Sequence, residues 1–209
     1  MNSILNPARL GAAALAAVIA LSLAACATPA VPGGPPLIGD TPHPESIVVG
    51  AGSVLQVDDS PAELCFYLLQ SYPPQCSGIE LIGWDWNTVE GSETASGVTW
   101  GSYAVWGTYD GETLTVTDSV LLALYDPLFE EHPKRLPENA GTTSESDLLT
   151  IQQQLHTDPP FDIVSSSPGN GYLFVTVYYD DGTYQEWADN RFGPDVIVIE
   201  NALRPVDGP

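Results

Sequence analysis

Residues 102–118, SYAVWGTYDGETLTVTD, decide the fold class of this chain. Aromatic and β-branched residues alternate along the stretch, so Tyr103, Val105 and Tyr109 fall on one face of an extended backbone. Asp110-Gly111 separates two such alternating runs, and Asp-Gly in this position is the strongest short-range signal of a β-hairpin. The sequence therefore predicts two antiparallel strands joined by a tight turn at these two residues.

Strand-like patterns continue upstream of the hairpin. IELIGWDW at 79–86 predicts a further strand, and SIVVGAGSVLQV at 46–57 predicts one or two strands bent at Gly50 and Gly52. PAELCFYLLQSY at 61–72 could form a short helical turn that ends at the following prolines. Residues 47–125 are thus expected to form a mostly antiparallel β domain, a barrel or sandwich similar in strand count to an oligonucleotide/oligosaccharide-binding barrel.

The last third of the chain predicts alternating helices and strands. Residues 126–144 contain three prolines and few apolar residues, so we interpret them as a connector. Ser144 to Asp147 fit a capping box ahead of an amphipathic helix at 145–156. A second capping box at 183–186 begins a helix that Gly193-Pro194 ends.

Three strands are expected between and after these helices. FDIVSS at 161–166 and YLFVTVYY at 172–179 predict a hairpin, and VIVIENAL at 196–203 predicts a buried strand. The order α-β-β-α-β over residues 145–206 indicates a small two-layer unit whose helices cover one face of a three-stranded sheet. The predicted fold class is therefore α+β.

The N-terminal residues indicate export and lipid anchoring. Residues 1–25 carry one positive charge, Arg9, an apolar run and no acidic residue, which is typical of a signal peptide. Leu23-Ala24-Ala25-Cys26 resembles the lipobox of bacterial lipoproteins, which predicts a diacylglycerol anchor and palmitate-type acylation at Cys26 and a place on the extracytoplasmic face of the cell membrane. Alternatively, Cys26 is incidental to an ordinary signal peptide, or the run is an uncleaved span.

A tether and a strongly acidic domain follow the predicted anchor. Residues 26–46 are rich in proline and are expected to extend from Cys26 to a folded part that begins near Ile47. The chain has 27 acidic residues against five Lys and Arg, a net charge of −22. This charge argues against a nucleic-acid partner, because the phosphates would be repelled.

Cys65 and Cys76 could form a catalytic pair, a metal clip or a disulfide. A catalytic cysteine needs a neighbouring base, yet the nearest histidines are His43 in the tether and His132 in the connector. A zinc site needs four ligands, and no second ligand pair follows. An exported domain is exposed to an oxidising compartment, so we expect a Cys65–Cys76 disulfide, with a free buried pair as the alternative.

Trp84, Asp85 and Trp86 form a possible ligand platform. Two tryptophans on the same side of one strand could stack on a sugar or a peptide, with the carboxylate as polar anchor. The alternative is that the indoles belong to the core, because aromatic side chains bury the largest area per residue.

Carboxylate clusters suggest calcium only weakly. Neither Asp85, Glu90 and Glu93 nor Asp180 and Asp181 follow the calcium-loop pattern. No serine-hydrolase elbow or phosphate-binding loop is present in the sequence. We therefore expect no catalytic residue, no metal and no cofactor, and whether the protein is an enzyme stays open, with a non-enzymatic role favoured.

The blocks PPQCSG, GWDW, GTYDG and DDGTYQEWADNRFGPDVIVIENALRPV give the sequence a family resemblance. Together they make it similar to a family of uncharacterised secreted or lipid-anchored bacterial envelope proteins, over most of residues 50–206. The resemblance implies an envelope location and a cystine, and it assigns no activity and no functional residue.

Three functions are compatible with these features. The first is a membrane-anchored envelope lipoprotein that binds a protein or a cell-wall component. The second is a carbohydrate-binding or carbohydrate-active protein that uses Trp84 and Trp86. The third is a calcium-dependent adhesive module.

Overall fold

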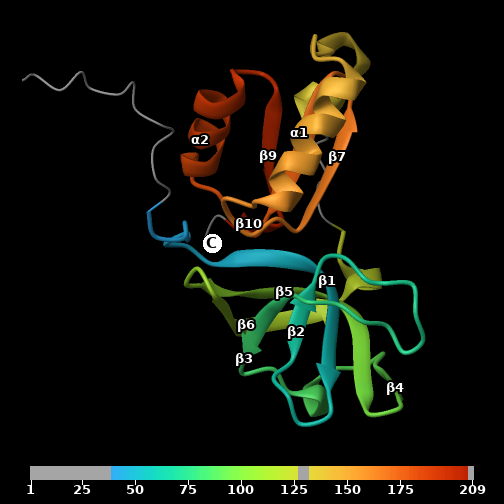
Figure 1. Ribbon diagram of the computed structural model, residues 1–209. Helices are drawn as coiled ribbons and strands as arrows, with labels where there is room; N and C mark the ends of the chain where they lie inside the picture. Colours follow the sequence, from blue (N-terminus) through green and yellow to red (C-terminus); the bar gives the residue numbers. More distant parts are fainter. Residues whose placement is uncertain (1–38, 127–131, 207–209) are drawn as a thin grey trace, which may run out of the picture. The chain divides into compact units, whose positions relative to one another are not determined.

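Five strands close into a ring in the computed structural model, which describes residues 39–126 and 132–206. The ring follows the order β1 (Val48–Val57), β2 (Glu63–Cys65), β3 (Ile79–Ile82), β6 (Thr113–Leu121) and β5 (Val98–Tyr109) (Figure 1). Pairing of β5 with β1 over ten residue pairs completes it. All neighbours are antiparallel except β3 and β6, which are parallel. The predicted β-barrel is confirmed.

The hairpin quoted above forms as predicted. Strands β5 and β6 flank Asp110-Gly111, and the Asp110 carboxylate accepts hydrogen bonds from the backbone N–H groups of Glu112 and Thr113. Tyr103, Val105 and Tyr109 are buried in the ring's core, as the alternation predicts. The pairing of β5 with β6 shifts register between Trp106 and Gly107, a bulge that increases local twist.

Two glycines allow strand β2 to fit closely between its neighbours. A Cβ atom at Gly52 would clash with the carbonyl oxygen of Cys65, and one at Gly78 would clash with that of Leu64. Inward-facing apolar side chains fill the interior of the ring, and among them Val48, Leu64 and Leu114 are fully buried. Small residues on the flanking segments therefore set how tightly the ring closes.

Two local predictions in the first half of the chain are wrong, and a third is resolved. Of the one or two strands predicted at 46–57, the structure has one, β1, because β5 pairs along its whole length. Residues 63–65 form strand β2 and no helical turn, since they pair with both β1 and β3. The predicted strand at 79–86 ends at Ile82, where Gly83 has a positive φ of 85° and turns the chain.

Short elements complete this half of the chain. A 3₁₀ turn, η1 (Trp86–Thr88), precedes the edge strand β4 (Glu93–Ala95), and a second one, η2 (Leu122–Leu124), follows β6.

A three-stranded sheet forms the C-terminal part, with β8 (Tyr172–Val177) between β7 (Ser165–Gly169) and β9 (Ile197–Asn201). Helices α1 (Glu145–Thr157) and α2 (Thr183–Phe192) are drawn in orange and red in Figure 1. Both helices share one hydrophobic cluster with β8 and β9, formed by residues such as Leu148, Leu155, Ala188, Val175 and Ile197. The predicted order α-β-β-α-β is confirmed.

The start of the hairpin in this part differs from the sequence prediction. The hairpin begins at Ser165 and not at Phe161, because Phe161 instead stacks on Tyr184 of α2 with ring centroids 4.2 Å apart. Its turn is Asn170-Gly171, both with positive φ, as a two-residue hairpin turn requires.

The capping of helix α2 also differs from the prediction, whereas that of α1 agrees with it. Ser144 caps α1 as predicted, accepting a hydrogen bond from the Asp147 N–H. Helix α2 begins at Thr183, but Asp180 replaces the predicted capping box by accepting bonds from the N–H groups of Tyr184 and Gln185. Carboxylates at a helix N-terminus are favoured by the helix dipole.

The connector covers the second face of the three-stranded sheet. It contains two 3₁₀ turns, η3 (Pro133–Arg135) and η4 (Pro137–Asn139). The guanidinium of Arg135 lies 3.9 Å from the ring centroid of Phe174, and Lys134 lies over Tyr172. Because these rings face away from the helices, cation–π contacts from the connector bury the opposite side of the sheet.

The chain then crosses from this sheet to the ring within a few residues. After β9 it passes Ala202 and forms β10 (Leu203–Pro205), which pairs with β1. The N–H groups of Ala202 and Leu203 donate to the carbonyls of Val177 and Tyr178 at this point. All described residues belong to one compact unit, residues 35–209.

No helix among the described residues is long and apolar enough to span a membrane.

The Gln185 side chain forms hydrogen bonds with the edge of β9 that pairs with no strand. Replacing Gln185 should therefore destabilise the fold. Its side-chain amide donates to the Ile197 carbonyl at 3.0 Å and accepts from the Ile199 N–H at 2.9 Å. We expect Gln185→Ala to lower the free energy of unfolding by about 1–2 kcal/mol, because two backbone groups lose their partner. Urea denaturation measures this loss. Gln153→Ala is the matched control, since Gln153 bonds only within its own helix turn; an equal loss there would contradict the role of Gln185.

Candidate functional site

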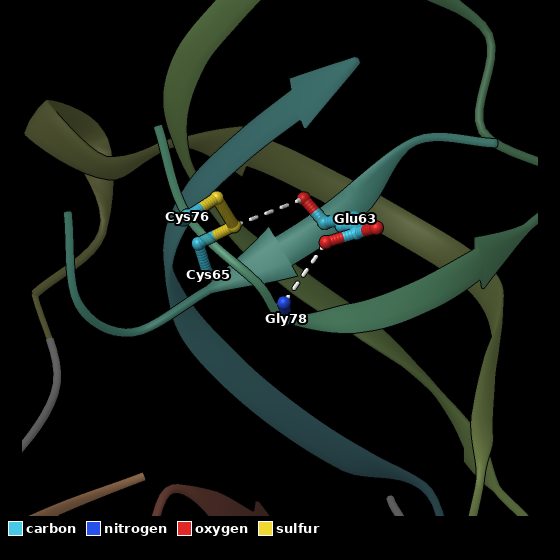
Figure 2. Close-up of a disulfide and its surroundings, with 4 residues drawn as sticks. All are labelled: Glu63, Cys65, Cys76 and Gly78. Atoms are coloured by element: carbon cyan, nitrogen blue, oxygen red, sulfur yellow. Dashed lines mark hydrogen bonds between the residues drawn. A yellow bond between two sulfur atoms is a disulfide. The ribbon is translucent and has the colours of Figure 1, made fainter. Parts of the chain in front are cut away.

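A disulfide joins Cys65 to Cys76, as the sequence predicts, with Cα atoms 6.1 Å apart. It closes the loop between β2 and β3, and Cys65 is only 1% exposed. Figure 2 shows Glu63 beside the sulfur atoms, with its carboxylate accepting a hydrogen bond from the Gly78 N–H at 2.9 Å. The disulfide and this bond fix both ends of the loop. An entropy estimate for such a loop gives about 3 kcal/mol of stabilisation.

The same residues form the one metal-like grouping found among the described residues. Single ligand atoms of Glu63, Cys65 and Cys76 lie within 4.8 Å of one another. A metal needs thiolate sulfurs, and here both sulfurs are bonded to each other. The three residues therefore stabilise the loop between β2 and β3. The one ligand left for a metal is the Glu63 carboxylate, which already accepts a backbone hydrogen bond.

A groove of about 860 Å³ opens beside the disulfide, and we call it the tyrosine groove. Its aromatic residues come from three separate segments: Phe66 and Tyr67 from the disulfide loop, Tyr109 from the end of β5, and Tyr178 from the position directly after β8. Tyr67 is 65% exposed at the rim, whereas Tyr109 is 3% exposed and donates its hydroxyl hydrogen to the Gly111 carbonyl. The rings thus extend from solvent into the buried core.

The polar groups of the tyrosine groove are acidic or neutral. Asp162 and Glu112 contribute carboxylates, and Gln75 and Ser77 contribute neutral side chains. Burial raises the pKa of Tyr178, and the negative charges of Asp162 and Glu63 raise it further. Burial also raises the pKa of Tyr109, with Asp162 among the further causes. The charge of Asp162 therefore acts on two phenols of the groove.

A second groove, of about 870 Å³, has basic as well as acidic side chains in its lining, and we call it the arginine groove. Arg135, Arg204 and His132 line it, together with Asp180 and Glu200. Arg135 donates to the Glu200 carboxylate from two nitrogens. Phe66 and Val164 line both grooves, so the two are neighbours with different charge.

Trp84 and Trp86 do not lie on a strand as predicted, because the chain turns at Gly83. Their rings meet edge to face, with centroids 5.3 Å apart and an interplanar angle of 82°, and both also pack on Tyr103. A flat stacking platform needs two coplanar faces, which this packing does not offer. Both indoles are half-buried, and the Nε1 of Trp86 donates to Gln56. Carbohydrate binding here stays a prediction that this geometry does not support.

Three of the carboxylates singled out in the sequence, those of Asp85, Asp180 and Asp181, accept hydrogen bonds from nearby backbone. Asp85 accepts hydrogen bonds from the backbone and side chain of Asn87, which hold the pKa of Asp85 below its usual value. Asp181 accepts from Thr183 in the same way, and its pKa is lowered too. These residues cap turns and helices, an arrangement that gives no support to a calcium site.

One His–Ser contact was not expected from the sequence. The Nε2 atom of His156 lies 2.9 Å from the Ser166 hydroxyl, and Gln152 donates to the same hydroxyl. A nucleophile–base pair also needs a third group to orient the histidine and a pocket for the substrate. The described structure gives His156 no such partner, and neither residue lines a groove described here. The contact ties helix α1 to the edge strand β7.

Comparison of the chain with protein-family models, curated proteins and solved structures finds no match. The resemblance to lipid-anchored envelope proteins therefore stays a prediction. Cys26 lies outside the described residues, as does the signal peptide.

Sequence reasoning missed the tyrosine groove. Its residues are spread from Phe66 to Tyr178, and no short motif links them. The one local signal was PPQCSG at 73–78, which contributes Gln75 and Ser77 to the wall. The groove could be recognised only after the strands were placed.

Replacing Asp162 should move tyrosine ionisation to lower pH. A raised pKa in the folded state adds stability that is fully present below pH 10 and is lost as the pH rises through the folded value, about 12 for Tyr184. Burial is the main cause at Tyr184, followed by the charge of Asp162. We expect Asp162→Asn to lower the pKa of Tyr178 and Tyr184, which tyrosinate absorbance measures. Asp59→Asn, on the exposed β1–β2 turn, should leave the titration unchanged; equal shifts in both variants would refute the local effect.

Proposed function

We propose that this protein is a lipid-anchored, non-enzymatic binding module on the extracytoplasmic face of a bacterial cell membrane, and that the tyrosine groove holds its ligand. The observation that carries this proposal is the convergence of Phe66, Tyr67, Tyr109 and Tyr178 on one concave surface. Ligand sites are typically concave, largely apolar and aromatic, with a few placed polar groups. Asp162, Glu112 and Gln75 supply such groups.

Anchoring through Cys26 is supported by the sequence and by the disulfide. The lipobox-like run Leu23–Cys26 follows an apolar segment, and a proline-rich stretch separates it from the first described strand. A Cys65–Cys76 disulfide fits an oxidising compartment outside the cytoplasm. Two acyl chains on one cysteine suffice for stable membrane attachment.

Binding is favoured over catalysis by the composition of the tyrosine groove. Its cysteine, Cys76, is held in the disulfide, and its described lining residues include no histidine that could act as a base. The phenol of Tyr109 already donates to a backbone carbonyl, and burial raises its pKa, so it is a poor nucleophile at neutral pH. The remaining groups are suited to contact a ligand.

Removing the lipidation site should release the protein from membranes. We expect Cys26→Ala to move the protein from the membrane fraction to the soluble extracytoplasmic fraction, because the acylated sulfur is lost. Cell fractionation with immunodetection measures this. Cys65→Ala is a control that removes a cysteine without touching the anchor. If Cys26→Ala stays membrane-bound in the same amount, the anchoring proposal is wrong.

A chemically mixed fragment set should identify the tyrosine groove as the ligand site. Using the folded protein lacking residues 1–26, we expect several fragments to shift the amide resonances of Gln75, Ser77 and Gly111 in ¹H–¹⁵N spectra. Ser77→Trp should fill the groove and abolish these shifts, whereas Ser60→Trp, on the β1–β2 turn, should not. If no fragment of any charge shifts these amides, the groove is not a ligand site.

A further inference from the structure

We propose that the tyrosine groove selects a small organic ammonium ion, such as a quaternary or protonated amine. This inference rests on the proposed function, because it names the ligand class of the same groove. It depends on three features of the described residues: the aromatic lining, the sign of the lining charges and the contrast with the arginine groove.

The aromatic lining supplies the first attraction. Phe66, Tyr67, Tyr109 and Tyr178 border the same space, and Phe66 and Tyr178 touch with ring centroids 6.1 Å apart. The face of an aromatic ring carries a negative electrostatic potential that attracts cations, and clusters of rings are the common recognition device for quaternary ammonium groups. Tyr178 is half-buried, so a cation against its ring is partly desolvated, which strengthens the contact.

The lining charges supply the second attraction. Asp162 and Glu112 border the groove, and no lysine, arginine or histidine does so among the described residues. Unlike Asp85, Asp110, Asp180 and Asp181, Asp162 accepts no hydrogen bond from the described part of the chain. Its charge is therefore not taken up by a backbone N–H, and it can face a ligand.

The negative potential of Asp162 extends to the ring hydroxyls of the groove. After burial, this carboxylate is the next cause that raises the pKa of Tyr178, and it also contributes at Tyr109. A potential that opposes a phenolate anion stabilises a cation placed at the same position. The rings and the carboxylate thus act on a bound ammonium in the same direction.

The arginine groove shows that this preference is local. Arg135 and Arg204 both line that second groove, although the whole sequence has only five lysines and arginines. Phe66 and Val164 separate it from the tyrosine groove. The basic groups are therefore placed next to the tyrosine groove and kept out of its lining.

The volume of the groove indicates a small ligand. About 860 Å³ lies within the range typical of small-molecule sites, roughly 300–1,000 Å³. A flat protein-binding surface would not need this concavity. We therefore assign the cation to a small molecule and not to a lysine side chain of a protein partner.

Choline and its neutral carbon isostere, in which carbon replaces the quaternary nitrogen, provide the test. We expect choline to shift the amide resonances of Gln75, Ser77 and Gly111 and to bind roughly tenfold more tightly than the isostere, the ratio that a cation–π contact of about 1.4 kcal/mol gives. Asp162→Asn should weaken choline binding several-fold and leave the isostere unchanged. Asp59→Asn removes the same charge outside the groove and should change neither.

Each other result contradicts the assignment. No choline binding, equal binding of the isostere, or equal weakening by Asp162→Asn and Asp59→Asn would each overturn it. Nα-acetyl-lysine amide, whose ε-ammonium group is free, is tested in parallel and should bind more weakly than choline. Tighter binding would move the ligand class to a protein side chain and overturn the small-molecule assignment. Unfolding curves confirm that each variant is folded, which is expected because Asp162 is exposed.

These outcomes are distinct from failure of the proposed function. If neutral or saccharide fragments shift the groove amides and choline does not, the groove remains a ligand site and only the ammonium assignment fails. If no fragment of any charge binds there, the proposed function fails as well.

Discussion

Pairing between β1 and β5 is the interaction on which the rest of the structure depends. Ten residue pairs join the two strands, and they close the ring that begins with β1 and β2. The opposite edge of β1 pairs with β2 at one end and with β10 at the other. Because β10 follows β9 directly, β1 also holds the C-terminal sheet against the ring. The pairing of β1 with both β5 and β10 therefore brings Tyr109, at the end of β5, close to Tyr178, which follows β8.

The sequence predicted local structure well and long-range structure poorly. The hairpin at Asp110-Gly111 and both helices follow from periodicity and end signals within about ten residues. Whether residues 63–65 form a turn of helix or a strand was decided by partners at 53–55 and 79–80, which local patterns do not encode. The strand predicted to extend through Trp86 ends at Ile82 for a local reason, because Gly83 permits the positive φ that turns the chain.

The connector illustrates the same limit. Its prolines and low apolar content suggest irregular structure, and its described residues between 132 and 144 form two 3₁₀ turns and neither a strand nor an α-helix. Its role comes from Lys134 and Arg135, whose cationic groups lie over Tyr172 and Phe174 on the sheet face that the helices leave uncovered. A charged loop can cover apolar surface because long basic side chains bury their stems and stack on rings. The candidate groove escaped prediction similarly, since its rings converge only once β1 joins both sheets.

The strongly acidic composition raises the question of whether any cation would be attracted equally to any surface of the molecule. A net charge of −22 produces a general field, but mobile salt screens exposed charges over about 10 Å. The charges of several carboxylates, such as those of Asp85 and Asp180, are also partly compensated by the backbone N–H groups that donate hydrogen bonds to them. What distinguishes the tyrosine groove is that Asp162, which accepts no hydrogen bond from the described residues, lies in one lining with the half-buried ring of Tyr178 and the buried ring of Tyr109. Selectivity for a cation therefore depends on where the charge lies as well as on the number of charges, since a cation held against the half-buried ring of Tyr178 is partly withdrawn from water and feels nearby charges more strongly there.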